Sequence, residues 1–468
     1  MARLPLRSPH TPFLPITEYG FISDCNSAAL VARDGSIDWL SLPRFDSPAV
    51  FARLLDPRAG HFSISPVEEA TARRRYRDGS LVLETIFETA SGTARLVDAM
   101  AFARGQGHDD MGFDVPHEIL RLVEGLTGSF EIEVEFAPRP EYGLVRPLIR
   151  LESTGARTFG GPNRLAMTSA APLTLDGATV RARLSIAAGD HAGFALRWAP
   201  AEARELEATP HDLVEEQLQV TEAAWRSWQA HHSVYEGPHA EQVHLSSRIL
   251  QGLTYRPTGA IVAAATTSLP EAAGGERNWD YRFAWIRDAS LTLNALYIGA
   301  CPDEAADFVS FMTSSAGATA GPDAALQIMY GIGGEHDLSE RELPHLRGWR
   351  DSRPVRVGNG AWSQTQLDVY GELLDAIHLY HDRLGSLHHE IQRFVADLAD
   401  AAARRWREKD AGMWEMRGEP RDHLSSKLLC WVALDRAVKL APHLEEHSNS
   451  ERWSAERDAI RQAIMNRG

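Results

Sequence analysis

The residues between Gly274 and Ser290 bring together side chains that could bind a polar ligand with flat apolar faces. This run contains two Trp, one Tyr, one Phe, three Arg and two Asp. Aromatic faces beside a planar guanidinium fork and carboxylate acceptors suit a sugar ring, which has apolar C–H faces and a belt of hydroxyls. An aromatic core turn with one surface Arg–Asp pair is the alternative interpretation. The candidate binding residues here are Trp279, Asp280, Arg282, Trp285, Arg287 and Asp288.

A second candidate segment begins near Glu408 and could supply an acid. Glu415 directly follows Trp414, and Arg417 lies two residues further on. Burial against a tryptophan raises the pKa of a carboxyl group, and a general acid needs a raised pKa near neutral pH. Glu415 is therefore a candidate general acid, with Trp414 and Arg417 beside it as candidate binding residues. An ordinary loop glutamate paired with Arg417 is the alternative.

A third candidate segment is the loop between Leu326 and Gln366. It places Tyr330 in a glycine-rich turn and Asn359, Trp362 and Gln364 near a predicted helix start. Glycines let the backbone approach a ligand closely, and amide and indole groups again suit sugar hydroxyls and faces. The glycine run does not open a βαβ unit, so a nucleotide-binding fingerprint is excluded. Tight packing of the loop is the alternative.

The first half of the chain reads as strands and turns. After an N-terminal tail, residues 1–14, the region 15–205 has Asp-Gly turns at Asp34, Asp78 and Asp176, and residues 130–136 alternate between apolar and polar. Many short strands at this spacing predict an antiparallel β-sandwich.

The second half reads as helices joined by long loops. Residues 206–238 have helical spacing and predict a helical linker, and residues 239–468 form an all-α domain with about seven helical segments. Long loops that carry aromatic and polar side chains are typically functional, and the candidate residues concentrate there. The predicted helical segments are 240–256, 282–299, 302–318, 362–382, 385–407, 423–440 and 449–466.

Composition excludes several classes of protein. The net charge of −16 over 468 residues argues against a nucleic-acid partner. No apolar run approaches the roughly 18 residues of a membrane span, and the N-terminus does not resemble a signal peptide. The three cysteines lie far apart and the histidines lack an HExxH pattern, so we expect no metal site. These features predict a cytoplasmic protein without a membrane partner.

Together, these motifs resemble glycoside hydrolase family 15, the glucoamylase-like enzymes, and especially its bacterial members that include trehalases. Residues 15–25 followed by 35–40 are similar to the trehalase-like N-terminal domain. Residues 278–288 are similar to the substrate-binding segment, 412–415 to the general-acid loop, and 356–371 also fit the family. The resemblance extends from about residue 15 to the last residue.

The resemblance implies a fold and a reaction. The fold is an N-terminal β-sandwich joined to an (α/α)6 toroid. The reaction is exo-hydrolysis of α-glucosidic bonds with inversion, and the implied substrate is an α-glucoside disaccharide or oligosaccharide, trehalose first and malto-oligosaccharides second. Glu415 would be the general acid, Arg287 and Asp288 would hold glucose hydroxyls, and the tryptophans would line the subsite. No cofactor or metal is implied, although some relatives respond to phosphate or magnesium.

The chain departs from the family in one respect. An inverting hydrolase needs a second carboxylate as general base, and no carboxylate here matches the family's base motif. We count about seven of the twelve toroid helices, so we expect an incomplete toroid and a chain truncated at its C-terminus. The alternatives left open are a glucoamylase, a disaccharide phosphorylase, in which phosphate replaces the activated water, and a non-catalytic sugar-binding protein. The oligomeric state is not predicted.

Overall fold

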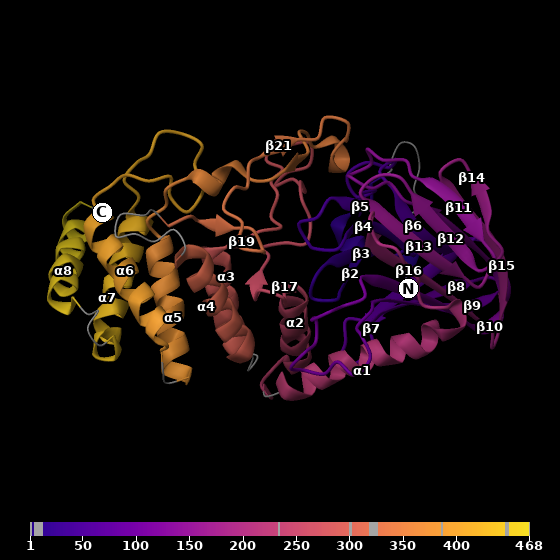
Figure 1. Cartoon of the computed structure of the whole chain (residues 1–468), viewed down its shortest axis with the longest axis horizontal. Coiled ribbons are helices and arrows are strands. Elements are labelled where there is room, and N and C mark those ends of the chain that lie inside the picture. The colour runs from indigo at the N-terminus through magenta and orange to yellow at the C-terminus, as the bar shows by residue number, and fades with distance from the viewer. Residues whose placement is uncertain are drawn as a thin grey trace. The chain divides into compact units, whose positions relative to one another are not determined.

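The computed structural model describes residues 2–3, 13–232, 235–298, 302–317, 326–384, 387–444 and 449–467. The chain forms two compact units, and each unit is assembled from three stretches. The β unit contains Met1–Pro257, Ala264–Tyr281 and Glu342–Val357, and the helical unit contains Thr258–Ala263, Arg282–Arg341 and Gly358–Gly468. Strands dominate the first unit and helices the second (Figure 1). This confirms the predicted order of a β-rich region before a helical region.

Two antiparallel sheets that share one long strand make up most of the β unit. The first sheet has the strand order β1-β7-β8-β9-β10-β16-β13-β12-β11. The first half of β10 pairs with β9 and β16, and its second half pairs with β6 and β15 in the second sheet. From β6 the second sheet continues through β4 and β3 to β2. The strands are β1 (Ala2–Arg3), β2 (Tyr19–Ser23), β3 (Ala28–Ala32), β4 (Ser36–Ser41), β5 (Ala49–Phe51), β6 (His61–Pro66), β7 (Ala70–Tyr76), β8 (Leu83–Thr89), β9 (Gly92–Met100), β10 (Glu118–Ala137), β11 (Leu148–Glu152), β12 (Gly155–Phe159), β13 (Asn163–Ser169), β14 (Thr174–Asp176), β15 (Thr179–Ala187) and β16 (His191–Pro200).

The predicted hairpin at Asp34-Gly35 is confirmed and shows why glycine is required there. The turn joins β3 to β4, and Gly35 has a φ of +81°. A Cβ atom at this position would lie 2.1 Å from the carbonyl oxygen of Ile64. Both the left-handed backbone and the close approach of the neighbouring strand therefore exclude a side chain.

A buried ion pair ties the two sheets together. Arg121 on β10 donates to Oδ1 of Asp98 at 2.7 Å and to the backbone oxygens of Phe62 and Gly35 at 2.6 Å each. Both charged side chains are fully buried. Burial raises the pKa of Asp98, and the adjacent guanidinium opposes that rise. Because Asp98 belongs to the first sheet and Phe62 to the second, one side chain satisfies polar groups of both layers.

Helix α1 (Val214–His232) corrects the prediction of a helical linker over 206–238. Trp225 and Trp228 on this helix are buried, and the Trp225 ring packs edge-on against Phe102 at 5.5 Å between centroids. Gln217 also donates to the backbone oxygen of Phe102 at 2.7 Å. The two tryptophans give α1 an apolar face that must be buried, so the helix packs on the β unit instead of bridging domains.

The predicted domain boundary at residue 239 also differs from the structure. Helix α2 (Ala240–Gly252) belongs to the β unit, and Ser23 Oγ donates to the backbone oxygen of Gly252 at 2.6 Å. The later segment 342–357 returns to the same unit, where Leu343, Trp349 and Val355 pack into a core cluster with Trp39. Apolar residues from the loop between Leu326 and Gln366, which was predicted to be functional, thus complete a core cluster of the β unit.

Within the described residues, helices α3 to α8 form most of the helical unit and lie in two layers (Figure 1). Helix α5 packs against both α3 and α7, and helix α6 packs against both α4 and α8. All six were predicted, although α3 and α5 begin later than expected because residues 284–285 form a short strand and residues 360–363 a 3-10 turn. The helices are α3 (Ile286–Ile298), α4 (Pro302–Gly317), α5 (Val369–Leu384), α6 (His389–Arg405), α7 (Leu424–Leu440) and α8 (Ser450–Arg467), and the short strands outside the sandwich are β17 (Thr254–Tyr255), β18 (Ala260–Ile261), β19 (Ala284–Trp285), β20 (Met329–Tyr330), β21 (Arg341–Glu342) and β22 (Arg356–Val357).

Two further predictions concern the N-terminal tail and membrane-spanning helices. Residues 4–12 of the predicted N-terminal tail lie outside the described residues. Within the described ranges, no helix combines the length and the apolar character needed to cross a membrane.

Replacing Arg121 with methionine tests the buried ion pair. The Arg121→Met variant should lose about 3–5 kcal/mol of unfolding free energy, because Asp98 would be left buried without its partner. Arg75→Met is the control, since Arg75 pairs with Glu84 at 3.0 Å but its side chain is 66% exposed; it should lose at most about 1 kcal/mol. Urea denaturation of the full chain measures the unfolding free energy of both variants. Equal losses would show that the buried Arg121–Asp98 pair contributes no more than an exposed ion pair.

Candidate active site in the helical unit

The carboxyl group of Glu415 is held by two residues of the first candidate segment. Its Oε1 accepts a hydrogen bond from Trp285 Nε1 at 2.8 Å and another from Arg287 Nη2 at 3.3 Å. Asp288 Oδ2 lies 3.9 Å from the same Arg287 nitrogen. The structure therefore brings together four of the predicted residues, although about 130 positions separate Trp285 from Glu415.

A short strand and a helix start position these donors. Strand β19 pairs with β20, with Trp285 opposite Met329, and helix α3 begins at the next residue. Trp285 is therefore fixed in a ladder and buried, while Arg287 and Asp288 lie in the first helical turn. Such a site rests on regular secondary structure, which limits the movement of its side chains. Tyr330 lies in β20 and is fully buried.

The loop that carries Glu415 is a tight turn with unusual backbone angles. Gly412 has a φ of +69° and Glu415 a φ of +53°, and Glu415 N donates to the Gly412 carbonyl at 3.0 Å. A residue other than glycine with positive φ is uncommon, and such residues concentrate at functional sites. The surrounding contacts must therefore hold Glu415 in this conformation.

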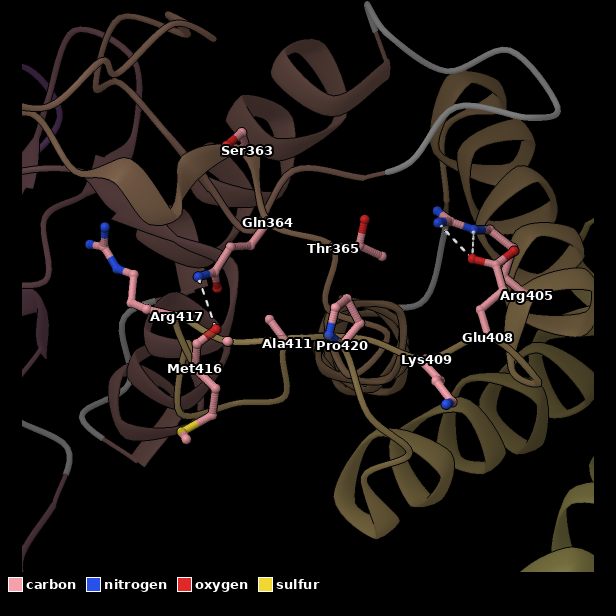
Figure 2. Close-up of a pocket in the computed structure, with 11 residues that line it drawn as sticks. Ser363, Gln364, Thr365, Arg405, Glu408, Lys409, Ala411, Met416, Arg417 and Pro420 are labelled. Atoms are coloured by element: carbon pink, nitrogen blue, oxygen red, sulfur yellow. Dashed lines mark hydrogen bonds and ion pairs between the residues drawn. The ribbon is translucent and has the colours of Figure 1, made fainter.

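Gln364 contacts the backbone of this loop from the opposite segment. Its Nε2 lies 3.4 Å from the carbonyl oxygen of Glu415 and 3.5 Å from that of Met416 (Figure 2). Asn359 caps the 3-10 turn Gly360–Ser363 that precedes Gln364, since its Oδ1 accepts from Ala361 N at 3.0 Å. Trp362 is half-buried within that turn.

An open cavity of about 390 Å³ lies beside the Glu415 loop. Gln364 and Thr365 line one part of it, and Met416 and Arg417 line another (Figure 2). Further along the same cavity, Arg405 pairs with Glu408 at 2.9 Å. The lining combines amide, hydroxyl and guanidinium groups, which can bind hydroxyls, with the apolar side chains of Ala411, Met416 and Pro420.

Two neighbours of Glu415 differ from the prediction. Trp414 is 81% exposed, so it does not supply the apolar cover expected for Glu415. Consecutive side chains of a tight turn point in different directions, and Trp285 is the tryptophan that contacts the acid. Arg417 pairs with Glu340, with Nη2 at 3.3 Å from Oε2.

Three further candidate residues, Trp279, Asp280 and Arg282, have the following surroundings. Trp279 and Asp280 belong to the β unit. There the guanidinium of Arg356 lies 4.7 Å from the centroid of the Trp279 ring, and Asp280 is buried in a β-bridge with Thr267. Arg282 is the first residue of its stretch of the helical unit, and its side chain is buried.

The sequence analysis missed two carboxylates at the start of α5. Asp368 is buried, and Glu372 lies one helical turn later, where Ser290 Oγ of α3 donates to its backbone oxygen at 3.1 Å. Burial and the charge of Asp368 raise the pKa of Glu372 to about 7, while Arg287 opposes this rise. The available signal was a pair of acids one turn apart, Asp368 and Glu372, where an amphipathic helix begins. Burial of an acid is unusual without a partner.

The Glu415 carboxyl group thus accepts hydrogen bonds from an indole N–H and a guanidinium, and other residues of its loop line the cavity. Comparisons with known proteins show which family this chain belongs to. Residues 237–468 match the family model described as glycosyl hydrolases family 15, and residues 11–189 match the model described as trehalase-like, N-terminal. The chain belongs to glycosyl hydrolase family 15 and is a glycoside hydrolase.

Similar proteins cover nearly all of the chain. A trehalase from Mycolicibacterium smegmatis is 38% identical over 477 residues, covering 98% of this chain and 70% of that protein. A trehalase from Mycobacterium tuberculosis is 38% identical over 484 residues, with 99% and 70% covered. Trehalase 1 from Sulfolobus acidocaldarius is 35% identical over 433 residues, with 90% and 70% covered.

The pKa of Glu372 predicts a dependence of stability on pH. Its value of about 7 lies above the ordinary 4.5, so the folded state favours the neutral acid. The stabilisation is complete below about pH 4.5 and is lost as the pH rises to about 7 and beyond. Glu372→Gln should remove this loss, so unfolding free energies measured at pH 4.5, 6 and 7.5 should fall less steeply in the variant than in the parent chain.

Asp375 on the same helix provides the control for that experiment. It pairs with Arg436 at 2.6 Å, and its charge raises the pKa of Glu372 less than burial or Asp368 does. The Asp375→Asn variant should therefore keep most of the decline between pH 4.5 and 7. Parallel pH curves for the parent chain and Glu372→Gln would show that Glu372 does not titrate in this range.

Proposed function

We propose that this chain hydrolyses trehalose and releases glucose, with Glu415 as the general acid. The observation that carries the proposal is the hydrogen-bonded set of Trp285, Arg287 and Glu415 in a chain that belongs to glycosyl hydrolase family 15. The names of the similar proteins support trehalose as the substrate.

In this proposal, Glu415 donates its proton to the glycosidic oxygen. Trp285 and Arg287 orient the acid and stabilise the carboxylate that forms after proton transfer, because their N–H groups already point at Oε1. Arg287 and Asp288 would also bind hydroxyls of the non-reducing glucose. The other proposed substrate contacts are Trp279, Asp280, Arg282, Tyr330, Asn359, Trp362, Gln364, Trp414 and Arg417.

Two of these proposed contacts already have structural partners. The amide oxygen of Asn359 caps a turn, and Arg417 pairs with Glu340. We propose that both shape the site more than they bind the sugar directly. Trp414 is largely exposed next to the acid, which leaves its face accessible to a ligand.

An inverting hydrolase needs a general base across the sugar from the acid, about 6.5–9.5 Å away, with a water between them. We assign no residue to this role. Arg287 opposes the rise in pKa that burial causes at Asp288, Asp368 and Glu372, and the proposal does not choose a base among them. The two helical layers would form part of an (α/α)6 toroid.

The proposal also includes location and cofactors. Cys25 and Cys430 are buried and not joined in a disulfide, which suits a reducing, cytoplasmic environment; Cys301 lies outside the described residues. General acid catalysis by carboxyl groups needs no resident cofactor. Assays with chelator, with added magnesium and with added phosphate test this part, since any of the three should leave hydrolysis unchanged.

Glucose release by the parent chain and its Glu415→Gln variant is the decisive test. The variant should lose about 10²–10⁴-fold in kcat, because glutamine cannot donate a proton to the leaving oxygen. Glu419→Gln is the control, since Glu419 is an exposed acid in the same loop, and it should retain full activity. Trehalose should be preferred over maltotriose.

Each other outcome of this assay identifies a different function. Preference for maltotriose would indicate a glucoamylase, and glucose 1-phosphate formed in step with phosphate consumption would indicate a phosphorylase. Binding of trehalose without turnover would indicate a sugar-binding protein. Undiminished release by Glu415→Gln would overturn the assignment of the acid.

Replacing Trp285 with phenylalanine tests the hydrogen bond to the acid. Trp285→Phe keeps an aromatic ring but removes the N–H, so kcat should fall about 5- to 100-fold. Trp406→Phe is a matched control: Trp406 Nε1 donates to Glu456 Oε2 at the same 2.8 Å distance elsewhere in the helical unit. Steady-state kinetics on trehalose measures both, and equal losses would indicate a general effect on folding.

A further inference from the structure

The loop that carries Glu415 receives little support from apolar burial. Trp414 and Met416, on either side of Glu415, are 81% and 55% exposed. Glu415 itself has a left-handed backbone, which costs free energy in a residue other than glycine. Polar contacts must therefore hold the turn in the conformation that directs the carboxyl group toward Trp285 and Arg287.

One such contact involves Arg417, two residues after the acid. Arg417 Nη2 lies 3.3 Å from Glu340 Oε2, and the same oxygen accepts a hydrogen bond from Gly360 N at 3.0 Å. A Cβ atom at residue 360 would lie 2.9 Å from Arg417 Nη1. The absence of a side chain at Gly360 thus makes room for the guanidinium, and Glu340 connects it to the backbone.

The two backbone segments that carry Glu340 and Gly360 are themselves held together. Asn359 N donates to the Leu338 carbonyl at 2.9 Å. This hydrogen bond joins the segment just before Glu340 to the segment just before Gly360. Gly358 has a φ of +76°, and a Cβ atom there would lie 2.2 Å from the Ser339 carbonyl oxygen. Residues 338–340 and 358–360 are therefore in close backbone contact, and Glu340 projects from a rigid base.

We propose that Glu340 is a positioning residue for the acid loop. By holding Arg417 against Gly360, it keeps the turn closed, and the closed turn keeps the Glu415 carboxyl group on Trp285 and Arg287. The catalytic consequence rests on the proposed function, whereas the anchoring of the loop does not. Arg417 thus acts through the loop that carries Glu415 more than through direct contact with the sugar.

The solvent exposure of Arg417 and Glu340 determines how large a change in kcat we expect. The side chains of Arg417 and Glu340 are 44% and 21% exposed, so solvent screens their attraction. Loss of the pair should therefore lower kcat by about two- to tenfold. This is much smaller than the loss expected when the acid itself is removed.

The experiment compares Glu340→Ala and Glu340→Gln with Glu419→Gln in the full chain. Limited trypsin digestion followed by mass spectrometry measures cleavage after Arg417, and steady-state kinetics on trehalose measures kcat and KM. Glu340→Ala should speed cleavage after Arg417 several-fold and lower kcat, with KM changed less than about twofold. Glu340→Gln keeps an acceptor for Gly360 N and should lie between Glu340→Ala and the parent, while Glu419→Gln should match the parent.

Distinct outcomes separate the anchoring from the proposed function. In one outcome, the parent chain releases no glucose while Glu340→Ala is still cleaved faster after Arg417. That result would support the anchoring of the loop by Glu340 and reject the trehalase assignment. Unchanged cleavage and kcat in a folded Glu340→Ala sample would overturn the positioning role. A raised KM with unchanged kcat would overturn it as well, because Arg417 would then bind the sugar directly. If Glu340→Ala does not fold, the intermediate behaviour required of Glu340→Gln decides the question.

Discussion

The carboxyl group of Glu415 must stay within reach of one indole N–H and one guanidinium, and much of the helical unit serves this constraint. The β19–β20 ladder fixes Trp285, and the start of α3 fixes Arg287. The acid must then come to these donors on an irregular turn with a left-handed residue. Rigid elements thus carry the partners, and the strained loop carries the group that reacts.

Much of the architecture follows from local sequence patterns. The turn at Gly35 and the six helices α3 to α8 were predicted because turn chemistry and apolar periodicity are local properties. Trp285, Arg287 and Glu415 were singled out as candidates because their residue types suit sugar chemistry. Their contact across two distant segments could not be derived from spacing, and the family resemblance supplied that link.

The features that escaped prediction depend on tertiary burial. Helix α1 was interpreted as a linker because helical spacing does not reveal which surface a helix packs on, and its two buried tryptophans lie in the β unit. The exposure of Trp414 depends on the path of a turn that no propensity scale describes. The charge environment of Asp368 and Glu372 arises from packing of α5 against α3, which the sequence of either helix alone does not reveal.

Residues 342–357 pack in the β unit, so folding of that unit depends on a segment that is synthesised after the first helices of the helical unit. Trp39 lies in a core cluster that Leu343, Trp349 and Val355 complete. A ribosome must therefore synthesise the chain through α3, α4 and the following loop before that core can close. The β unit cannot mature first as an independent body, and its late segment reaches it only after part of the helical unit has emerged.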